Sequence, residues 1–307
     1  MPEGLTTVLA LLSWGLENYN KLSRGFSGLQ GWFKGNPGNH NDSGDLKESK
    51  ERGILMIGPG GTGKTTLAEL LSGITDLSAG DATKYNESID VDRYTLKDAP
   101  RVELLVTPGQ RHRRPALWPD LLSNVASGAY RGIVVFGSYG YHSLNSSYKN
   151  HELYRENTSK SKFLASYLQE AKEDEIEIVR KLIPLLDVAP NPPWLLHVIT
   201  KQDIWWKQRL EAKRFYKNGT FGKILDELSE RKPKIRFEQA FVSLTISNFR
   251  SGANELLKEN AAGYDQRMQI DSILQLIEAF ARIKHWRHNN EPNVEGSYRN
   301  QLRRNAS

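Results

Sequence analysis

The chain has 307 residues, a net charge of +6, 38% hydrophobic residues and no cysteine. This length suits one large domain, or one domain with attachments, and the lack of cysteine excludes disulfides, thiolate metal sites and cysteine catalysis. No apolar run approaches the ~20 residues of a membrane span. The N-terminus lacks the basic region that opens a signal peptide, and no Lys/Arg block of nucleic-acid-binding type is present. We therefore expect a cytoplasmic protein with no specific nucleic-acid partner.

The first segment, residues 4–33, carries apolar side chains at steps of three and four, which predicts an amphipathic helix within residues 1–34. Three roles are open for its apolar face: packing back on the following domain, binding a partner protein, or binding a membrane surface. We do not favour the membrane, because Glu17 accompanies Lys21 and Arg24 on the polar face. Residues 35–51 are rich in glycine, asparagine and charge, which predicts a flexible linker.

Residues 53–73 carry the strongest signal in the chain. An apolar run, 54–57, predicts a buried strand, and the next eight residues fit the pattern G-x-x-x-x-G-K-S/T. Leucines at helical spacing follow, and Gly73 stands where a glycine would end that helix. Glycines let main-chain N–H groups surround a polyphosphate, Lys64 is expected to reach its outer phosphates, and the Thr65 hydroxyl is expected to bind Mg²⁺. The predicted phosphate-binding residues are Gly58, Pro59, Gly60, Gly61, Thr62, Gly63, Lys64, Thr65 and Thr66.

Strands and helices alternate along the rest of the chain. We predict strands at 88–96, 101–106, 132–136, 194–199 and 239–244, and helices at 117–122, 161–187, 206–230 and 270–283, with Pro184 kinking the second helix or ending it early. Residues 138–160 are polar and indicate an insertion, and 288–307 are expected to be a disordered tail. This alternation predicts an α/β fold: a P-loop NTPase three-layer α/β/α sandwich with a mostly parallel sheet, spanning 52–287.

Two tetrapeptides follow predicted strands directly: Thr107-Pro108-Gly109-Gln110 and Thr200-Lys201-Gln202-Asp203. Each alone is common. In this order after a phosphate-binding loop, they resemble the motif set of small GTPases of the Ras/Arf type, over about residues 53–285 apart from the insertion. The chain is most similar to bacterial small GTPases, some of which carry T-P-G-Q without the usual preceding aspartate.

The resemblance implies GTP or GDP with Mg²⁺ as ligands. It implies that Gly109 donates its N–H to the γ-phosphate and that Gln110 orients the attacking water. Gln110 and Lys64 would then be the catalytic residues, with Lys64 on the phosphates. Thr65 and Thr83 would contact Mg²⁺. The base would be recognised by Thr200, Lys201, Asp203 and Ser243, with Asp203 accepting from the guanine N–H groups.

One departure from the family pattern concerns the metal, because Val106 stands where the usual D-x-x-G motif has aspartate. Asp81 or Asp90 could substitute, and nothing in the sequence selects one. A second open point is Arg111, Arg113 and Arg114, which could supply an arginine to the γ-phosphate or, as we favour, form a solvated or partner-facing surface.

Three functions remain open at this stage. The first is a molecular switch that hydrolyses GTP slowly. It has protein partners at the N-terminal helix and at the switch segments, which are Thr83 and residues 106–118. The second is a pseudo-GTPase that acts as a binding module. The third is an ATPase or kinase that uses adenine nucleotide.

Overall fold

The computed structural model describes residues 53–74, 88–96, 99–156 and 159–290. The expected N-terminal helix and linker, Thr83, and the tail beyond residue 290 lie outside these residues. Within them, the chain folds around a six-stranded sheet with the order β2-β3-β1-β4-β5-β6. Its strands are β1 (Ile54–Ile57), β2 (Asp92–Leu96), β3 (Ala99–Val106), β4 (Gly132–Gly137), β5 (Trp194–Ile199) and β6 (Phe237–Phe241).

Five of these strands run parallel, and only β2 pairs antiparallel with its neighbour β3. The central strands β1, β4 and β5 are buried at every position. Continuous apolar runs suit such strands, because a parallel sheet is covered on both faces. Parallel order also brings the carboxyl ends of β1, β3, β4, β5 and β6 to one edge of the sheet.

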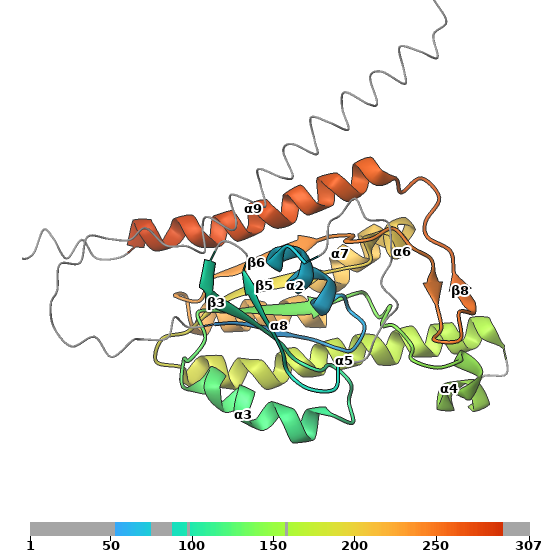
Figure 1. Cartoon of the computed structure of the whole chain (residues 1–307), viewed down its shortest axis with the longest axis horizontal. Helices are drawn as coiled ribbons and strands as arrows, with labels where there is room; N and C mark the ends of the chain where they lie inside the picture. Colours follow the sequence, from blue (N-terminus) through green and yellow to red (C-terminus); the bar gives the residue numbers. More distant parts are fainter. Residues whose placement is uncertain (1–52, 75–87, 97–98, 157–158, 291–307) are drawn as a thin grey trace, which may run out of the picture.

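Helices cover the two faces, as Figure 1 shows. On one side, α2 (Lys64–Ser72) and α9 (Gln266–Asn290) pack on side chains such as Met56. On the other side, α3 (Arg114–Ala126) and α5 (Lys160–Val188) pack on alternate side chains such as Leu55. Two more helices belong to this second layer, α7 (Arg209–Lys217) and α8 (Thr220–Arg231). The strand period of two therefore divides the core into two halves, and the expected three-layer sandwich is confirmed.

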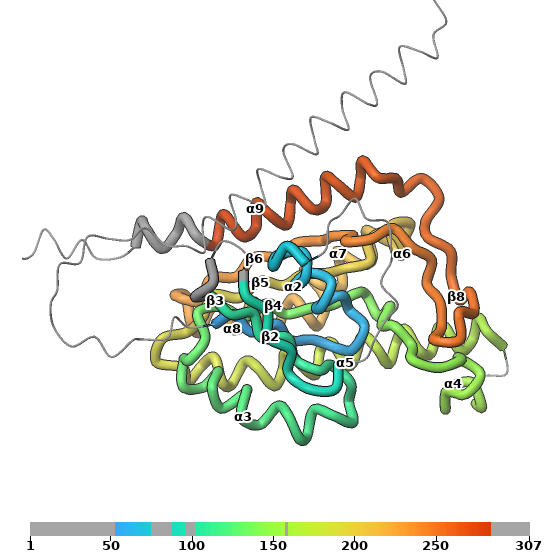
Figure 2. The backbone as a smooth tube through the Cα atoms, in the orientation of Figure 1, coloured from blue at the N-terminus to red at the C-terminus, as the bar shows by residue number. Residues whose placement is uncertain are grey.

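Smaller elements gather at one end of the molecule. They are the 3₁₀ turns η1 (Tyr148–Asn150) and η2 (Trp206–Gln208), the short helices α4 (Glu152–Glu156) and α6 (Gln202–Trp205), and a hairpin of β7 (Phe249–Arg250) and β8 (Leu256–Lys258). The segment after β4 touches the hairpin, since the Ser147 hydroxyl donates to Glu255 at 2.8 Å. Figure 2 shows both running past the same end of the sheet.

Several predicted elements need correction. The single helix expected over 206–230 is wrong: the chain turns at Asn218 and Gly219, where a methyl group on the glycine would lie 2.7 Å from the Phe215 carbonyl oxygen. The strand expected at 239–244 starts at Phe237 and ends at Phe241, and the strand expected at 88–96 starts at Asp92. Pro184 does not end α5, which continues to Val188.

Two further elements differ from expectation. The polar insertion contains η1 and α4, and the β7–β8 hairpin was not predicted at all. The final helix α9 starts before residue 270 and reaches Asn290. None of the helices in the described part of the chain has the length and apolar composition that a bilayer crossing needs.

Candidate functional site

The glycine-rich loop after β1 has the backbone of a phosphate-binding loop. Gly61 and Gly63 lie in the left-handed region, with φ of 66° and 88°, and α2 begins immediately afterwards at Lys64. Glycine adopts this conformation at little cost, so main-chain N–H groups can turn inward above the helix N-terminus. The loop is tied internally, because the Thr62 hydroxyl donates to the Pro59 carbonyl at 2.9 Å. This arrangement suits a bound phosphate chain.

Lys64 supplies the cationic side chain of this loop. Its ammonium donates to the carbonyl oxygens of Gly58 at 3.0 Å and Pro59 at 2.7 Å, and the residue is only 6% exposed. Burial lowers the pKa of Lys64 from 10.5 to about 7; the Arg114 charge adds to this effect and Asp174 opposes it. A buried ammonium of this kind is stabilised by an anion placed beside it. The site is therefore chemically fitted to a polyphosphate.

The T-P-G-Q segment lies directly against the phosphate-binding loop. A methyl group on Gly109 would come within 2.3 Å of the Gly60 nitrogen, so only glycine allows this approach. The preceding Thr107 continues the β-ladder, donating its N–H to the Met56 carbonyl at 3.0 Å. Gln110 starts the turn into α3, since its carbonyl accepts from the N–H of Arg113 at 3.0 Å. The structure thus brings two of the three expected motifs together.

Arg114 anchors this segment from behind. Its Nε and Nη2 donate to the Gly109 carbonyl at 2.9 and 2.6 Å, and it forms a two-point ion pair with Asp174 of α5 at 2.6 Å for each contact. Both side chains are at most 8% exposed. Burial by itself would raise the pKa of Asp174, but the Arg114 hydrogen bonds and charge hold it below its usual value. The interpretation of Arg114 as a solvated surface residue is therefore wrong.

Arg111, unlike Arg114, faces solvent, as the favoured interpretation expects. It is half exposed, and its guanidinium pairs with Glu170 and, at 3.0 Å, with Asp174. Two arginines of the segment after Gln110 are thus bound to acids of α5, and neither reaches freely toward a phosphate.

The T-K-Q-D loop meets the phosphate-binding loop on its other side. The Thr200 hydroxyl donates to the Thr62 carbonyl at 2.7 Å, which joins the two loops directly. The Asp203 carboxylate accepts from the Ser243 hydroxyl, and from the Ser247 N–H at 3.0 Å. Asp203 is 1% exposed, and burial raises its pKa. The predicted base-recognition residues therefore lie in one cluster beside the predicted phosphate site.

Lys201 completes the cluster from a left-handed backbone, with φ of 58°. Its ammonium donates to the Tyr141 carbonyl at 2.7 Å and the Ser143 hydroxyl at 3.0 Å. Burial lowers the pKa of Lys201 to about 8, against the opposing charge of Asp203. Lys201 is thus held by the segment that follows β4.

The residues available for a metal ion are few. Among the described residues, no group of three or more acidic or histidine side chains could hold a metal. Val106 is fully buried among apolar side chains, and the Asp90 carboxylate accepts from the neighbouring Val91 N–H. Mg²⁺ bound with nucleotides takes most of its ligands from phosphates and water, so the Thr65 hydroxyl beside Lys64 fits that role. Thr83 and Asp81 lie outside the described residues.

The sequence did not predict the roles of three buried residues that hold the loops of the candidate site. They are Arg114, which anchors Gly109, and the adjacent acids Asp174 and Glu175. A signal was present, because 174 and 175 fall on the apolar stripe of α5 between Ala171 and Ile178. A charge on a buried stripe needs a partner, since an unpaired buried charge is strongly unfavourable. The pattern therefore indicated a buried polar site, although it could not indicate the partners.

The mostly parallel strand order and the phosphate-binding loop between β1 and α2 define an α/β P-loop fold. No protein-family model and no curated protein sequence matches the chain.

Solved structures that resemble the chain include bacterial selenocysteine-specific elongation factor EF-Sec (17% identity, TM-score 0.34, covering 75% of this chain and 29% of that one). A second is NFeoB of S. thermophilus bound to GDP.AlF4- (10% identity, TM-score 0.36, covering 76% and 63%). A third is the signal recognition particle receptor SRb with GDP and Mg from Chaetomium thermophilum (15% identity, TM-score 0.37, covering 75% and 98%). The chain thus spans less than a third of the elongation factor and less than two thirds of NFeoB.

Proposed function

We propose that this protein binds guanine nucleotide with Mg²⁺, hydrolyses GTP slowly, and acts as a molecular switch. The observation that supports the proposal most is the bond between the Thr200 hydroxyl and the Thr62 carbonyl. It joins the loop that carries Asp203 to the loop that carries Lys64. A buried carboxylate for a base and a buried ammonium for phosphates are then parts of one site.

In this proposal, each residue binds or orients. Lys64 and the main-chain N–H groups of residues 60–65 neutralise the phosphates, and Thr65 binds the metal, which would spread the charge of the outer phosphates. The Asp203 carboxylate accepts from the base. Gly109 donates its N–H to the terminal phosphate, and Gln110 orients the attacking water. The T-P-G-Q segment would then report which nucleotide is bound, because it makes its contact with the terminal phosphate alone.

We expect slow hydrolysis because Arg111 and Arg114, which follow Gln110 in the chain, are already bound to other groups of the protein. An arginine placed on the terminal phosphate is worth about 10³–10⁵ in rate. Arg114 is bound to Asp174 and the Gly109 carbonyl, and Arg111 is bound to acids of α5. An activating partner that supplies an arginine fits this site, and the switch segments are where we expect such partners to bind.

The base specificity is tested by calorimetry with GTP and ATP on the purified full chain. We expect GTP to bind more tightly, and Asp203→Asn to weaken GTP by about 100-fold, because an amide N–H₂ would face the donors of guanine. Asp226→Asn, an exposed aspartate on α8, is the matched control and should behave like the wild type. Equal affinity for ATP and GTP would point instead to an adenine-nucleotide enzyme.

A second function, a pseudo-GTPase that binds nucleotide without hydrolysing it, is favoured by buried Val106, because β3 then offers no carboxylate to the metal. Single-turnover hydrolysis decides between the two. Phosphate release that disappears in Gln110→Leu supports the enzyme, and no release from the wild type supports the binding module. Pull-down with Gln110→Leu as bait, loaded with GTP or GDP, would then identify nucleotide-dependent partners.

A further inference from the structure

The segment that follows β4, residues 138–143, has an unusual backbone. Tyr139 and Gly140 are consecutive left-handed residues, with φ of 55° and 84°. A bulky residue in this region costs on the order of 1 kcal/mol, so surrounding contacts must hold it there. We call this segment the 138–143 loop.

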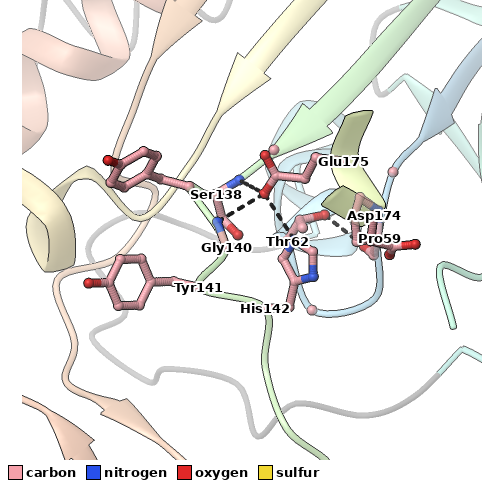
Figure 3. Close-up of polar contacts among 12 residues, drawn as sticks. Pro59, Thr62, Ser138, Gly140, Tyr141, His142, Asp174 and Glu175 are labelled. Carbon is pink, nitrogen blue, oxygen red and sulfur yellow. Dashed lines mark hydrogen bonds and ion pairs between the residues drawn. The ribbon is translucent and has the colours of Figure 1, made fainter. Parts of the chain in front are cut away.

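Those contacts converge on Glu175 of α5, as Figure 3 shows. One carboxylate oxygen, Oε1, accepts from the N–H groups of Ser138 at 2.9 Å and Gly140 at 3.1 Å, and contacts His142 Nε2 at 2.9 Å. The other oxygen accepts from the Tyr216 hydroxyl at 2.5 Å, and Tyr216 in turn accepts from the Tyr139 N–H at 2.6 Å. Glu175 is 1% exposed. A single buried carboxylate therefore holds Ser138, Gly140 and His142 directly, and it holds Tyr139 through the Tyr216 hydroxyl.

The far end of the same loop touches both halves of the proposed nucleotide site. The Tyr141 carbonyl and the Ser143 hydroxyl accept from the Lys201 ammonium, as described above. Ser143 also donates to the Gly61 carbonyl, from its N–H at 3.4 Å and its hydroxyl at 3.3 Å. The space is tight, because a methyl group on Gly61 would lie 2.5 Å from the Ser143 Cβ. The loop thus connects Glu175 with the phosphate-binding loop and with Lys201.

We infer that Glu175 is a positioning residue of the nucleotide site: through the 138–143 loop it sets where Lys201 and Gly61 lie, and so sets nucleotide affinity without touching the nucleotide. The inference rests on the proposed function, since Lys201 and Gly61 matter only if a nucleotide binds there. It assigns to α5 a role that none of the sequence motifs carries.

Glu175→Gln tests this role, with GDP as the probe. The amide keeps the shape of the side chain but replaces one acceptor oxygen with an NH₂ donor. That donor would then face either the Tyr216 hydroxyl or the N–H groups of the loop, which are donors themselves. We expect GDP affinity to fall about 5- to 30-fold, the effect of losing one or two charge-assisted hydrogen bonds. The single-turnover rate at saturating GTP should change less than about twofold, because Gln110 and Gly109 are held separately by Arg114.

A double-mutant cycle with Lys201→Met distinguishes a specific effect of Glu175 on the position of Lys201 from a general loosening of the protein. Because part of the effect of Glu175 runs through Lys201, the affinity loss of the double variant should be smaller than the product of the two single losses. Multiplying losses would overturn the inference, and so would full GDP affinity in a folded Glu175→Gln protein. Glu177→Gln, two residues along α5 and half exposed, is the matched control and should leave affinity unchanged.

Tyr216→Phe keeps the test decisive if Glu175→Gln does not fold. It removes only the hydroxyl that joins Glu175 to Tyr139, so GDP affinity should fall by a smaller factor, about 2- to 5-fold. The wild type reports on the proposed function in the same assay. Absence of GDP binding by the wild type would overturn both proposals, whereas wild-type binding that Glu175→Gln and Tyr216→Phe leave unchanged would overturn only this one.

Discussion

The phosphate side and the base side of the proposed site are built in different ways. The phosphate side comes from one continuous stretch, β1 to α2, whose own glycines and main chain make the loop. The base side joins segments that are far apart in the chain: Thr200 to Asp203, Ser243 to Ser247, and the 138–143 loop. A site built locally can be recognised from sequence alone, whereas a site built from distant segments depends on the fold.

The two sides share one feature, a pair of consecutive acids on α5. Asp174 holds the T-P-G-Q segment through Arg114, and Glu175 holds the 138–143 loop. Adjacent helix positions point about 100° apart, so one turn of α5 can serve both sides. Substitutions at Lys64, Arg114 and Ser243 distinguish the two sides.

Lys64→Met should strongly weaken phosphate binding while leaving the fold intact. GDP affinity should fall by about 100-fold or more, because a buried charge-assisted contact to phosphate is lost. The melting temperature should not fall, because a buried ammonium is replaced by an apolar side chain of similar length. Calorimetry and thermal unfolding measure the two. A variant that melts earlier yet binds GDP normally would contradict the assignment of Lys64.

Arg114→Lys should damage the phosphate side through the T-P-G-Q segment. Lysine cannot bond the Gly109 carbonyl and both Asp174 oxygens at once, so unfolding free energy should fall by about 2 kcal/mol. GTP hydrolysis should slow more than GDP affinity weakens, since Gly109 and Gln110 lose their anchor. Arg180→Lys, exposed on α5, is the control. Equal losses of rate and affinity would mean that the anchor serves both sides.

Ser243→Ala should affect the base side alone. Its hydroxyl donates to the Asp203 carboxylate, and this bond opposes the rise in the Asp203 pKa that burial causes. We expect the preference for GDP over ADP to fall about tenfold. Ser247→Ala retains the main-chain N–H that Asp203 accepts, so it should leave the preference unchanged. A larger effect from Ser247→Ala than from Ser243→Ala would reverse this assignment.

The pH dependence of binding reports on the phosphate side through Lys64. The Lys64 pKa is about 7 in the free protein, and bound phosphate should raise it. Below pH 7 the ammonium is already charged, so binding should take up little proton there. At pH 8 binding should take up close to one proton, and affinity should fall as pH rises above 7. Calorimetry in buffers of different ionisation enthalpy measures the uptake. Lys201→Met should retain this uptake if Lys64 is its source.

Sequence reasoning recovered what short-range pattern determines. The loop from Gly58 to Thr65, the glycine that ends α2, and the buried strands follow from glycine placement and apolar runs. It did not predict the break at Gly219, because the apolar spacing of the predicted helix continues across the turn. At this turn, Gly219 lies close to the Phe215 carbonyl oxygen. It also missed the β7–β8 hairpin, because strands of two and three residues are too short to show an alternating pattern. It missed the partners of Asp174, because Arg114 lies 60 positions away in the chain.

The near-complete burial of Lys64 and Asp203 bears on how ionic strength should act on this protein. Mobile ions screen charges that face water, over about 8 Å at physiological salt, but they screen enclosed charges far less. Added potassium chloride should therefore weaken surface ion pairs such as Arg93 with Glu103 well before it weakens the proposed nucleotide contacts of Lys64 and Asp203.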